Sequence, residues 1–184
     1  MSLEKTRDSL SSQINPILPN DGKTKLASVL ILIFEESSNI LMIKKPITMN
    51  QHGGEIAFPG GKISDEDIDL LDTAIRETKE ETGISVARNQ IIGQLKPVTT
   101  LNSGFTILPF VCILKKMNDL TPNSEVEEFL EIPLISLLQT LSNDKDPEHN
   151  SMQEMYTFTF HDHVIWGASA RMLKQMTDKL QINE

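Results

Sequence analysis

The segment that most constrains the fold is "RETKEETG", residues 76–83 of a 184-residue chain. It closes a stretch, residues 67–82, whose apolar side chains recur at helical spacing on one face: Leu70, Leu71, Ala74, Ile75 and Thr78. We therefore predict an amphipathic helix over residues 67–82. Gly83 is its predicted end, because glycine adopts the left-handed conformation that closes the last turn of many helices.

Three carboxylates crowd the last turns of this predicted helix: Glu77, Glu80 and Glu81. A helix C-terminus carries partial negative charge and favours cations, and carboxylates three or four residues apart repel one another. At about 100° per residue, the three side chains fall within an arc of about 100° beside the apolar face. A solvated acidic face is one interpretation of this cluster. A divalent-cation site is the other, because Mg²⁺ and Mn²⁺ prefer hard oxygen ligands and offset the repulsion between adjacent carboxylates.

The metal interpretation predicts phosphate chemistry rather than a structural ion. Mg²⁺ is usually held by few carboxylates together with substrate phosphates. The chemistry would then be attack of a metal-activated water on phosphorus, with a further carboxylate as base. The segment "FPGG", residues 58–61, precedes the helix, and its glycines allow a backbone carbonyl or amide to approach the same ion or a phosphate closely.

The sequence "GGKISDEDIDLLDTAIRETKEETGI", residues 60–84, resembles the Nudix box, the signature of Nudix hydrolases. The pattern is a glycine, five residues, an acid, seven residues, then Arg-Glu, an aliphatic residue, any residue, Glu-Glu, any residue, Gly and an aliphatic residue. The positions that match in register are Arg76, Glu77, Glu80, Glu81, Gly83 and Ile84. Thr78 takes the place of the usual aliphatic residue, and the stretch from Gly61 to Arg76 is one residue longer than in the general pattern.

The resemblance implies a site for Mg²⁺ or Mn²⁺ made of the Gly61 carbonyl and three carboxylates, those of Glu77, Glu80 and Glu81. It also implies that Glu77 orients or deprotonates the attacking water. Arg76 is implied to be a structural residue that holds a carboxylate through a charge-assisted bond. Either Asp67 or Glu66 is expected to support the loop before the helix.

The longer box is similar to a variant found in the coenzyme A pyrophosphatase branch of the Nudix family. That branch places "HxGEIxFPGG" before the box, and residues 52–61 read "HGGEIAFPGG". Near its end the branch has "IWG", one residue, Ser or Thr, and Ala-Arg, and residues 165–171 read "IWGASAR". Where the branch carries "LLTxRS" and a further arginine, this chain has "LMIKKP", residues 41–46, and Asn50.

This closer resemblance implies that the substrate is coenzyme A or an acyl derivative, and that it contacts Lys45, His52 and Glu55. His52 either touches the substrate or acts as a base, or else makes a hydrogen bond that orders its loop. Nudix enzymes often carry one further catalytic carboxylate in a loop that contains, in this chain, Glu125, Glu127 and Glu128. Glu125 is the preferred residue, and the alternative is that these are acids at the start of a helix.

The composition restricts the partners. A net charge of −9 argues against a broad electrostatic grip on nucleic acid or on an anionic membrane. The apolar run "ASVLILIF" is too short to cross a bilayer, and no secretory signal pattern precedes it. Cys112 is the single cysteine, so no internal disulfide can form, which fits a cytoplasmic protein. The expected partner is a small-molecule nucleotide substrate, and a homodimer is compatible with this composition.

We predict an α+β protein with the Nudix fold, in which a mixed β-sheet is sandwiched between α-helices. Residues 1–25 are expected to form an N-terminal arm, and residues 26–184 a single Nudix hydrolase domain. The other elements that matter below are predicted from apolar runs and prolines. They are strands at 26–34 and 40–45, a polar connection at 120–129, and a helix at 132–141 with Pro133 in its first turn.

The predicted activity is Mg²⁺- or Mn²⁺-dependent hydrolysis of a pyrophosphate bond in a nucleoside diphosphate linked to another group. Coenzyme A or an acyl derivative is the first choice of substrate. Within the class, ADP-ribose, dinucleotides and an oxidised nucleotide are the alternatives. From a different class, a Nudix-fold module would sense a nucleotide without cleaving it. Degenerate modules of that kind tend to lose glutamates of the box, and all three are present here.

Overall fold

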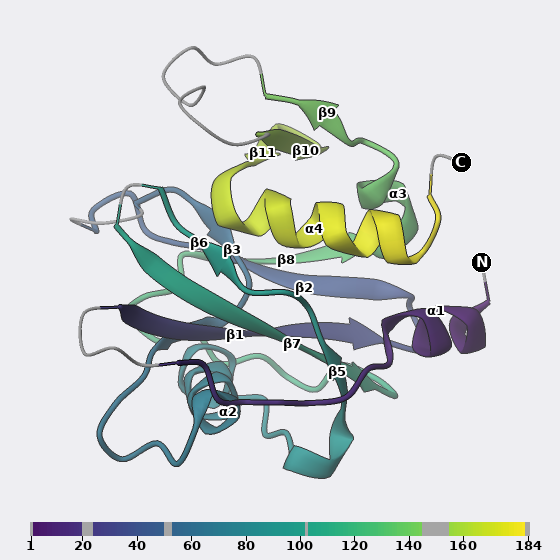
Figure 1. Ribbon diagram of the computed structural model, residues 1–184. Helices are drawn as coiled ribbons and strands as arrows, with labels where there is room; N and C mark the ends of the chain where they lie inside the picture. The colour runs from purple at the N-terminus through teal and green to yellow at the C-terminus, as the bar shows by residue number, and fades with distance from the viewer. Residues whose placement is uncertain (1, 20–23, 50–52, 102, 145–154, 183–184) are drawn as a thin grey trace.

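The computed structural model describes residues 2–19, 24–49, 53–101, 103–144 and 155–182. Eight strands of this described part form one mixed sheet (Figure 1). At its centre β1 (Lys25–Phe34) pairs in parallel with β7 (Phe105–Leu114) and antiparallel with β2 (Asn39–Lys44) and β4 (Gly60–Lys62). The other strands pair antiparallel with β2 or β7: β3 (Ile56–Ala57) and β8 (Glu128–Pro133) with β2, and β5 (Ile91–Gln94) and β6 (Val98–Thr99) with β7.

Helices cover both faces of this sheet (Figure 1). On one face lies α2 (Leu70–Thr82), and on the other lie α4 (Gly167–Lys179) and α3 (Leu134–Leu138). A small antiparallel sheet packs beside α4 and consists of β9 (Ser142–Asn143), β10 (Tyr156–Phe160) and β11 (His163–Ile165). A short 3-10 turn, Arg88–Gln90, leads into β5. The predicted α+β architecture, with a mixed sheet between helices, is confirmed.

The central strand β1 is buried on both of its faces, which explains its nearly continuous run of apolar residues. Its odd-numbered residues, such as Ile31 and Ile33, belong to a hydrophobic core that includes residues of α4. Its even-numbered residues, such as Leu30 and Leu32, belong to a second core that includes residues of α2. The strand predicted at residues 26–34 is confirmed, and it separates two cores.

The two ends of α2 are set by individual residues. Gly83 has a φ of 78° and donates its N–H to the Lys79 carbonyl at 2.9 Å, so the helix ends where it was predicted to end. The start is later than predicted, at Leu70 rather than residue 67. The reason is the Asp69 side chain, which caps the helix by accepting hydrogen bonds from the N–H groups of Leu71 and Asp72 at 2.9 Å.

The region before α3 differs from the prediction. Residues 128–133 form strand β8, which pairs along the whole of β2, where a polar connection followed by a helix was expected. Leu130 and Ile132 are buried while Glu131 and Pro133 are exposed, so this part of the segment follows the two-residue period of a half-buried strand. Pro133 ends this strand and precedes the helix, which is confined to Leu134–Leu138.

The N-terminal segment begins with α1 (Leu3–Leu10), which Ser2 caps through its side chain. The chain then runs extended beneath the sheet as drawn in Figure 1. Backbone hydrogen bonds tie it down at two points: from the Ser12 N–H to the Ile92 carbonyl at 3.1 Å, and from the Leu70 N–H to the Pro16 carbonyl at 3.2 Å. The second of these contacts joins the segment to the first residue of α2.

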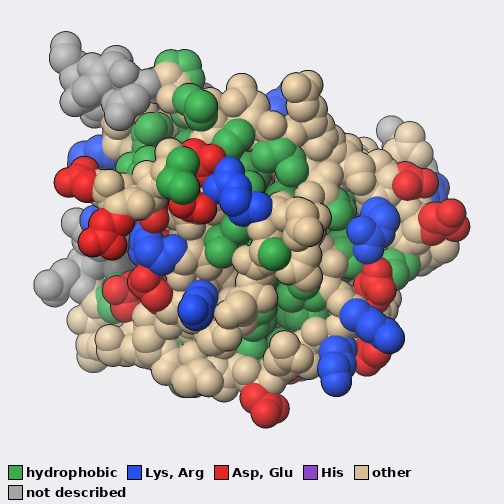
Figure 2. Space-filling model, turned by 90° about the horizontal axis from the view of Figure 1, so that it is seen from below, with side chains coloured by type: hydrophobic (Ala, Val, Ile, Leu, Met, Phe, Trp, Pro, Cys, Tyr) green, Lys and Arg blue, Asp and Glu red, His purple; other side chains and the backbone are tan. Residues whose placement is uncertain are grey.

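The surface of the described residues is of mixed charge. On the face shown in Figure 2, Lys and Arg side chains are interspersed with Asp and Glu side chains, and apolar side chains show between them. Among the described residues, none of the helices has the length and apolar character needed to cross a membrane. Figure 2 thus agrees with the sequence in offering no broad basic field on this face.

Candidate active site

A cleft of about 420 Å³ lies between the sheet and the first turns of α4. Its apolar lining comes from the sheet and from the start of α4, and includes Ala27, Val29, Ile107, Phe58, Trp166 and Met172. Its polar lining includes Lys45, Glu55, Lys62, Glu77, Glu125, Thr100 and Ser103. The cleft therefore joins a polar, charged region to an apolar one.

Glu77 reaches this cleft from α2, although α2 lies on the opposite face of the sheet (Figure 1). Gly61 in β4 makes this geometry possible. A Cβ atom at position 61 would stand 2.6 Å from both oxygens of the Glu77 carboxylate, so any other residue would displace that group. The missing side chain at Gly61 lets a carboxylate on the α2 side contribute to a cleft on the α4 side.

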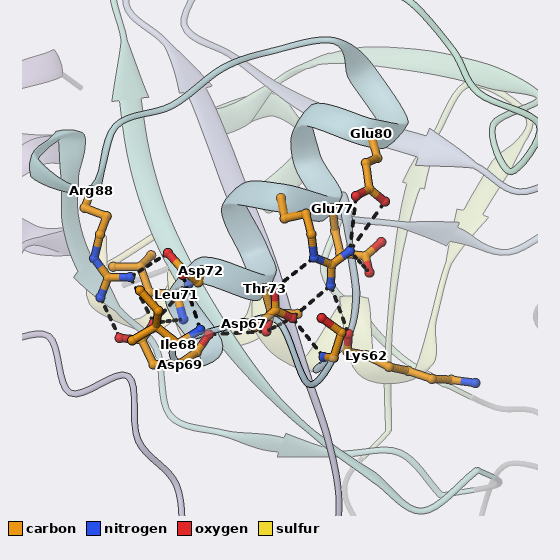
Figure 3. Close-up of polar contacts among 12 residues, drawn as sticks. Lys62, Asp67, Ile68, Asp69, Leu71, Asp72, Thr73, Glu77, Glu80 and Arg88 are labelled. Carbon is orange, nitrogen blue, oxygen red and sulfur yellow. Dashed lines mark hydrogen bonds and ion pairs between the residues drawn. The ribbon is translucent and has the colours of Figure 1, made fainter.

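Arg76 organises the next part of the site through contacts with three carboxylates. Figure 3 labels these partners, Asp67, Glu77 and Glu80. The Arg76 guanidinium holds the almost fully buried Asp67 by two hydrogen bonds, from Nε at 2.8 Å and from Nη2 at 2.9 Å. Arg76 keeps the pKa of the Asp67 carboxyl well below its usual range, assisted by the Ser64 N–H. Nη1 of the same guanidinium donates to Glu77 at 2.8 Å and lies 3.4 Å from Glu80.

Glu81 occupies a different environment, because its side chain is only 1% exposed. One carboxylate oxygen accepts the Gly60 N–H at 2.8 Å, and the other accepts a hydrogen bond from Lys45 Nζ at 3.3 Å. Burial raises the pKa of Glu81 to about 7, and the nearby Lys45 and the Gly60 N–H oppose this shift. The Lys45 Nζ also lies 3.7 Å from the Glu125 carboxylate, so one ammonium group links two acids.

The three glutamates of the box are therefore close along α2 but face different partners. Glu77 and Glu80 contact Arg76, whereas Glu81 contacts Lys45. Within the described part of the chain, no three His, Cys, Asp or Glu side chains lie close enough together to hold a metal ion. The donor set of carboxylate and carbonyl oxygens nevertheless fits Mg²⁺ or Mn²⁺, because both ions prefer hard oxygen ligands.

The other residues that the sequence pointed to have different outcomes. Glu125 and Glu55 line the cleft. Glu127 instead forms an ion pair with Lys44 at 2.8 Å. Glu128 is an exposed residue of β8. His52 and Asn50 lie outside the described residues.

The sequence did not single out several residues of the cleft, among them Lys62, Thr100, Ser103 and Phe105. Trp166, which belongs to the "IWGASAR" segment, also lines the cleft. A signal existed for Lys62, because it directly follows the glycine that approaches Glu77. The residues of β7 and of the turn before it carried no comparable signal, since only the pairing of β7 with β1 brings them to the site.

Thr78 provides a test of packing beneath the site. Its hydroxyl is buried and has no hydrogen-bond partner among the described residues. An unsatisfied buried polar group costs about 1–3 kcal/mol, so Thr78→Val should raise the free energy of unfolding by about 1 kcal/mol in urea denaturation. Thr82→Val is the matched control and should lower it, because the Thr82 hydroxyl donates to the Thr78 carbonyl at 2.6 Å. A destabilised Thr78→Val variant would contradict this account.

Comparison with known proteins agrees with the fold. The NUDIX domain family model matches residues 24–159, and the chain therefore belongs to the Nudix family. A protein of Photorhabdus laumondii, described as the uncharacterized Nudix hydrolase NudL, is 30% identical over 166 residues, which are 89% of this chain and 88% of the relative. Nudix hydrolase 22 of Arabidopsis thaliana, described as chloroplastic, is 33% identical over 164 residues, 82% of this chain and 54% of that protein.

Solved structures show the same fold at lower sequence identity. A MutT/nudix family protein from Enterococcus faecalis matches with a TM-score of 0.61 at 14% identity, over 92% of this chain and 65% of that one. The NUDIX domain of Shewanella oneidensis NrtR, solved in complex with ADP ribose, matches with a TM-score of 0.52 at 19% identity, over 63% of this chain and 77% of that one. Family membership makes this protein a Nudix hydrolase, of the class that cleaves pyrophosphate bonds in nucleotide derivatives and generally uses divalent metal ions.

Proposed function

We propose that this Nudix hydrolase cleaves the pyrophosphate bond of coenzyme A or of an acyl-coenzyme A. One observation carries the proposal: both segments that resemble the coenzyme A pyrophosphatase branch line the same cleft. The upstream segment contributes Glu55, Ala57, Phe58 and the glycine pair, and the segment near the end contributes Trp166, Ala168 and Ser169. The apolar part of the lining suits a substrate that carries a long, weakly polar arm beside its pyrophosphate.

The metal ligands in this proposal are the carboxylates of Glu77, Glu80 and Glu81 and the carbonyl of Gly61. A bound Mg²⁺ or Mn²⁺ would supply charge for the pyrophosphate oxygens and lower the pKa of a water molecule. Glu77 already stands in the cleft, where its carboxylate can orient the attacking water. Arg76 positions Glu77 while its main contact remains the buried Asp67.

Lys45 and Glu125 complete the proposed reaction. The Lys45 ammonium lines the cleft and can donate a hydrogen bond to a pyrophosphate oxygen. Glu125 lines the cleft beside it and accepts the proton of the attacking water. The water oxygen forms a new bond to phosphorus, the bridging P–O bond breaks, and the products are two phosphate monoesters.

Other substrates of the same class remain the alternatives, namely ADP-ribose, dinucleotides and an oxidised nucleotide. A nucleotide-sensing module is the alternative outside enzymology. The retained carboxylates favour an enzyme. Burying the Glu81 carboxylate costs folding free energy, and a sensor that binds a nucleotide without metal chemistry would not need a carboxylate there.

A substrate panel tests the proposal. The protein is incubated with Mg²⁺ or Mn²⁺ and with coenzyme A, acetyl-coenzyme A, ADP-ribose, a dinucleoside polyphosphate or a nucleoside triphosphate, and the products are separated by chromatography. We expect the two coenzymes to give the highest kcat/KM, and EDTA to abolish turnover. A higher kcat/KM for ADP-ribose or a dinucleotide would refute the choice of substrate. Tight nucleotide binding without turnover would support the sensor instead.

A further inference from the structure

Two lysines flank one aromatic ring at the end of the cleft where β1 begins. The ammonium groups of Lys25 and Lys62 lie 5.5 Å and 5.3 Å from the centroid of the Phe105 ring. The three residues come from β1, β4 and β7, which are adjacent in the sheet. Lys62 and Phe105 line the cleft itself.

Strand register places these residues at one side of the sheet. Lys25 is paired with Phe105, and two residues further along both strands Ala27 is paired with Ile107. Residues two apart in a strand point to the same face, and Ala27 and Ile107 line the cleft. Lys25 therefore faces the side of the sheet that forms the cleft, just beyond its apolar floor.

The hydroxyl groups of Thr100 and Ser103 add polar groups to the same corner. Both residues line the cleft, and their hydroxyl oxygens are 2.8 Å apart. Lys25 Nζ is 3.4 Å from the Ser103 carbonyl oxygen, so its ammonium is held near these hydroxyls. One of the two hydroxyl groups donates to the other, and the remaining hydroxyl and the two ammonium groups form a set of donors suited to an anion.

Lys25 and Lys62 differ from Lys44 and Lys45 in whether a carboxylate lies next to the ammonium group. Lys44 is paired with Glu127, and Lys45 with Glu81. Neither Lys25 nor Lys62 has a carboxylate within 4.0 Å among the described residues. Placing two like charges on one ring is unfavourable unless an anion joins them, because the ring face offsets only part of the repulsion.

We propose that Lys25, Lys62 and Phe105 form a subsite for a phosphate monoester that the substrate carries outside its scissile pyrophosphate. The strand register agrees with the distance expected between this phosphate and the scissile pyrophosphate. Gly61, which adjoins Glu77, is paired with Ser28, and Lys25 lies three residues along β1 from Ser28. Three residues of strand span about 10 Å, which is comparable with the distance across a ribose from its 5′-pyrophosphate to a second phosphate. The subsite thus selects nucleotides with a second phosphate on the ribose.

This inference rests on the proposed function, and a pair of substrates tests it. Coenzyme A and dephospho-coenzyme A differ only in the phosphate on the ribose. We expect the wild-type protein to favour coenzyme A by at least about tenfold in kcat/KM, since dephospho-coenzyme A leaves the charged donors of the subsite without their partner. In the Lys25→Gln/Lys62→Gln variant this ratio should fall to about one. The matched control is Lys115→Gln/Lys116→Gln, which removes the same charge just beyond the other end of β7 and should keep the wild-type ratio.

Binding without turnover separates the two proposals. Calorimetry with metal-free protein should show that adenosine 3′,5′-bisphosphate binds more tightly than adenosine 5′-monophosphate, and that the Lys25→Gln/Lys62→Gln variant loses this difference. If neither coenzyme is cleaved but the binding difference is present and lost in the variant, the proposed function fails and the subsite stands. If the wild-type protein shows no preference in either measurement, or if the variant keeps it, the subsite is overturned.

Discussion

Replacing Glu81 by glutamine is expected to reduce kcat/KM with saturating Mg²⁺ by about 100-fold or more. Glutamine keeps the size of the side chain and can still accept the Gly60 N–H, but it cannot supply the negative charge that the metal requires. A metal ion contributes several kcal/mol of charge stabilisation to such a reaction, and each 1.36 kcal/mol corresponds to tenfold in rate. Turnover of the best substrate of the panel, measured under initial-rate conditions, checks this expectation.

The control for Glu81→Gln is Glu36→Gln, which removes one exposed carboxylate in the turn between β1 and β2. Its kcat/KM should stay within about twofold of the wild-type value, since surface substitutions away from a site have small effects. Wild-type activity in the Glu81→Gln variant would mean that the carboxylates of the box do not bind the catalytic metal.

The same substitution should stabilise the metal-free protein at alkaline pH. Burial raises the pKa of Glu81 from 4.5 to about 7, so the folded protein holds a proton that the unfolded chain releases at lower pH. The free energy of unfolding therefore declines as the pH rises from about 4.5 through 7. Glutamine does not ionise, so with EDTA at pH 8 the variant should be more stable by up to about 3 kcal/mol, and at pH 4 this advantage should vanish. Urea denaturation at both pH values measures the difference.

Replacing Arg76 by alanine is expected to lower the free energy of unfolding by about 3 kcal/mol. The substitution leaves Asp67, whose side chain is 3% exposed, without the guanidinium that now donates two hydrogen bonds to it. Removing one partner of a buried ion pair typically costs about 3–5 kcal/mol, and we take the lower end because the Arg76 side chain is 29% exposed. Urea denaturation at pH 7 provides the measurement.

The effect of Arg76→Ala should depend on pH in a defined direction. Arg76 holds the pKa of Asp67 below its usual value of 3.8, so its stabilising contribution is present above about pH 4 and is lost as the pH falls further. The matched control is Arg7→Ala, which breaks a pair with Glu35 at 2.8 Å that is more exposed than the pair of Arg76 with Asp67, and it should cost less than about 1 kcal/mol. If both variants lose the same free energy of unfolding, the contact of Arg76 with Asp67 stabilises the protein no more than the pair of Arg7 with Glu35.

Local sequence signals predicted the parts of the fold that depend on local chemistry. The apolar run of β1 and the glycine that ends α2 were both interpretable from neighbouring residues alone. Strand β8 was missed, because only Leu130 and Ile132 are buried in it, and the exposed Glu128 and Glu131 made the segment resemble a polar connection. Its assignment depends on β2, which lies far away in the sequence.

The candidate site, like β8, could be predicted from the sequence only where neighbouring residues determine it. The spacing of Glu77, Glu80 and Glu81 in the sequence indicated a shared edge of a helix, yet burial gives the three carboxylates different surroundings. The contact of Lys45 with Glu81 joins a loop to a helix 36 residues away, and no local pattern could indicate it. The Phe105 corner likewise depends on the pairing of β1 with β7.

That parallel pairing also has a consequence for how the chain folds. Each residue of β1 is matched with the residue 80 positions later in β7, so the centre of the sheet closes a very long loop. Pairings of such long range slow folding, because their loop-closure entropy must be overcome before the contacts form. The helix that bears the glutamates lies inside this loop, and during synthesis the pairing of β1 with β7 cannot be completed until residue 114 has left the ribosome. We therefore expect the cleft between the sheet and α4 to be among the last features of the molecule to form.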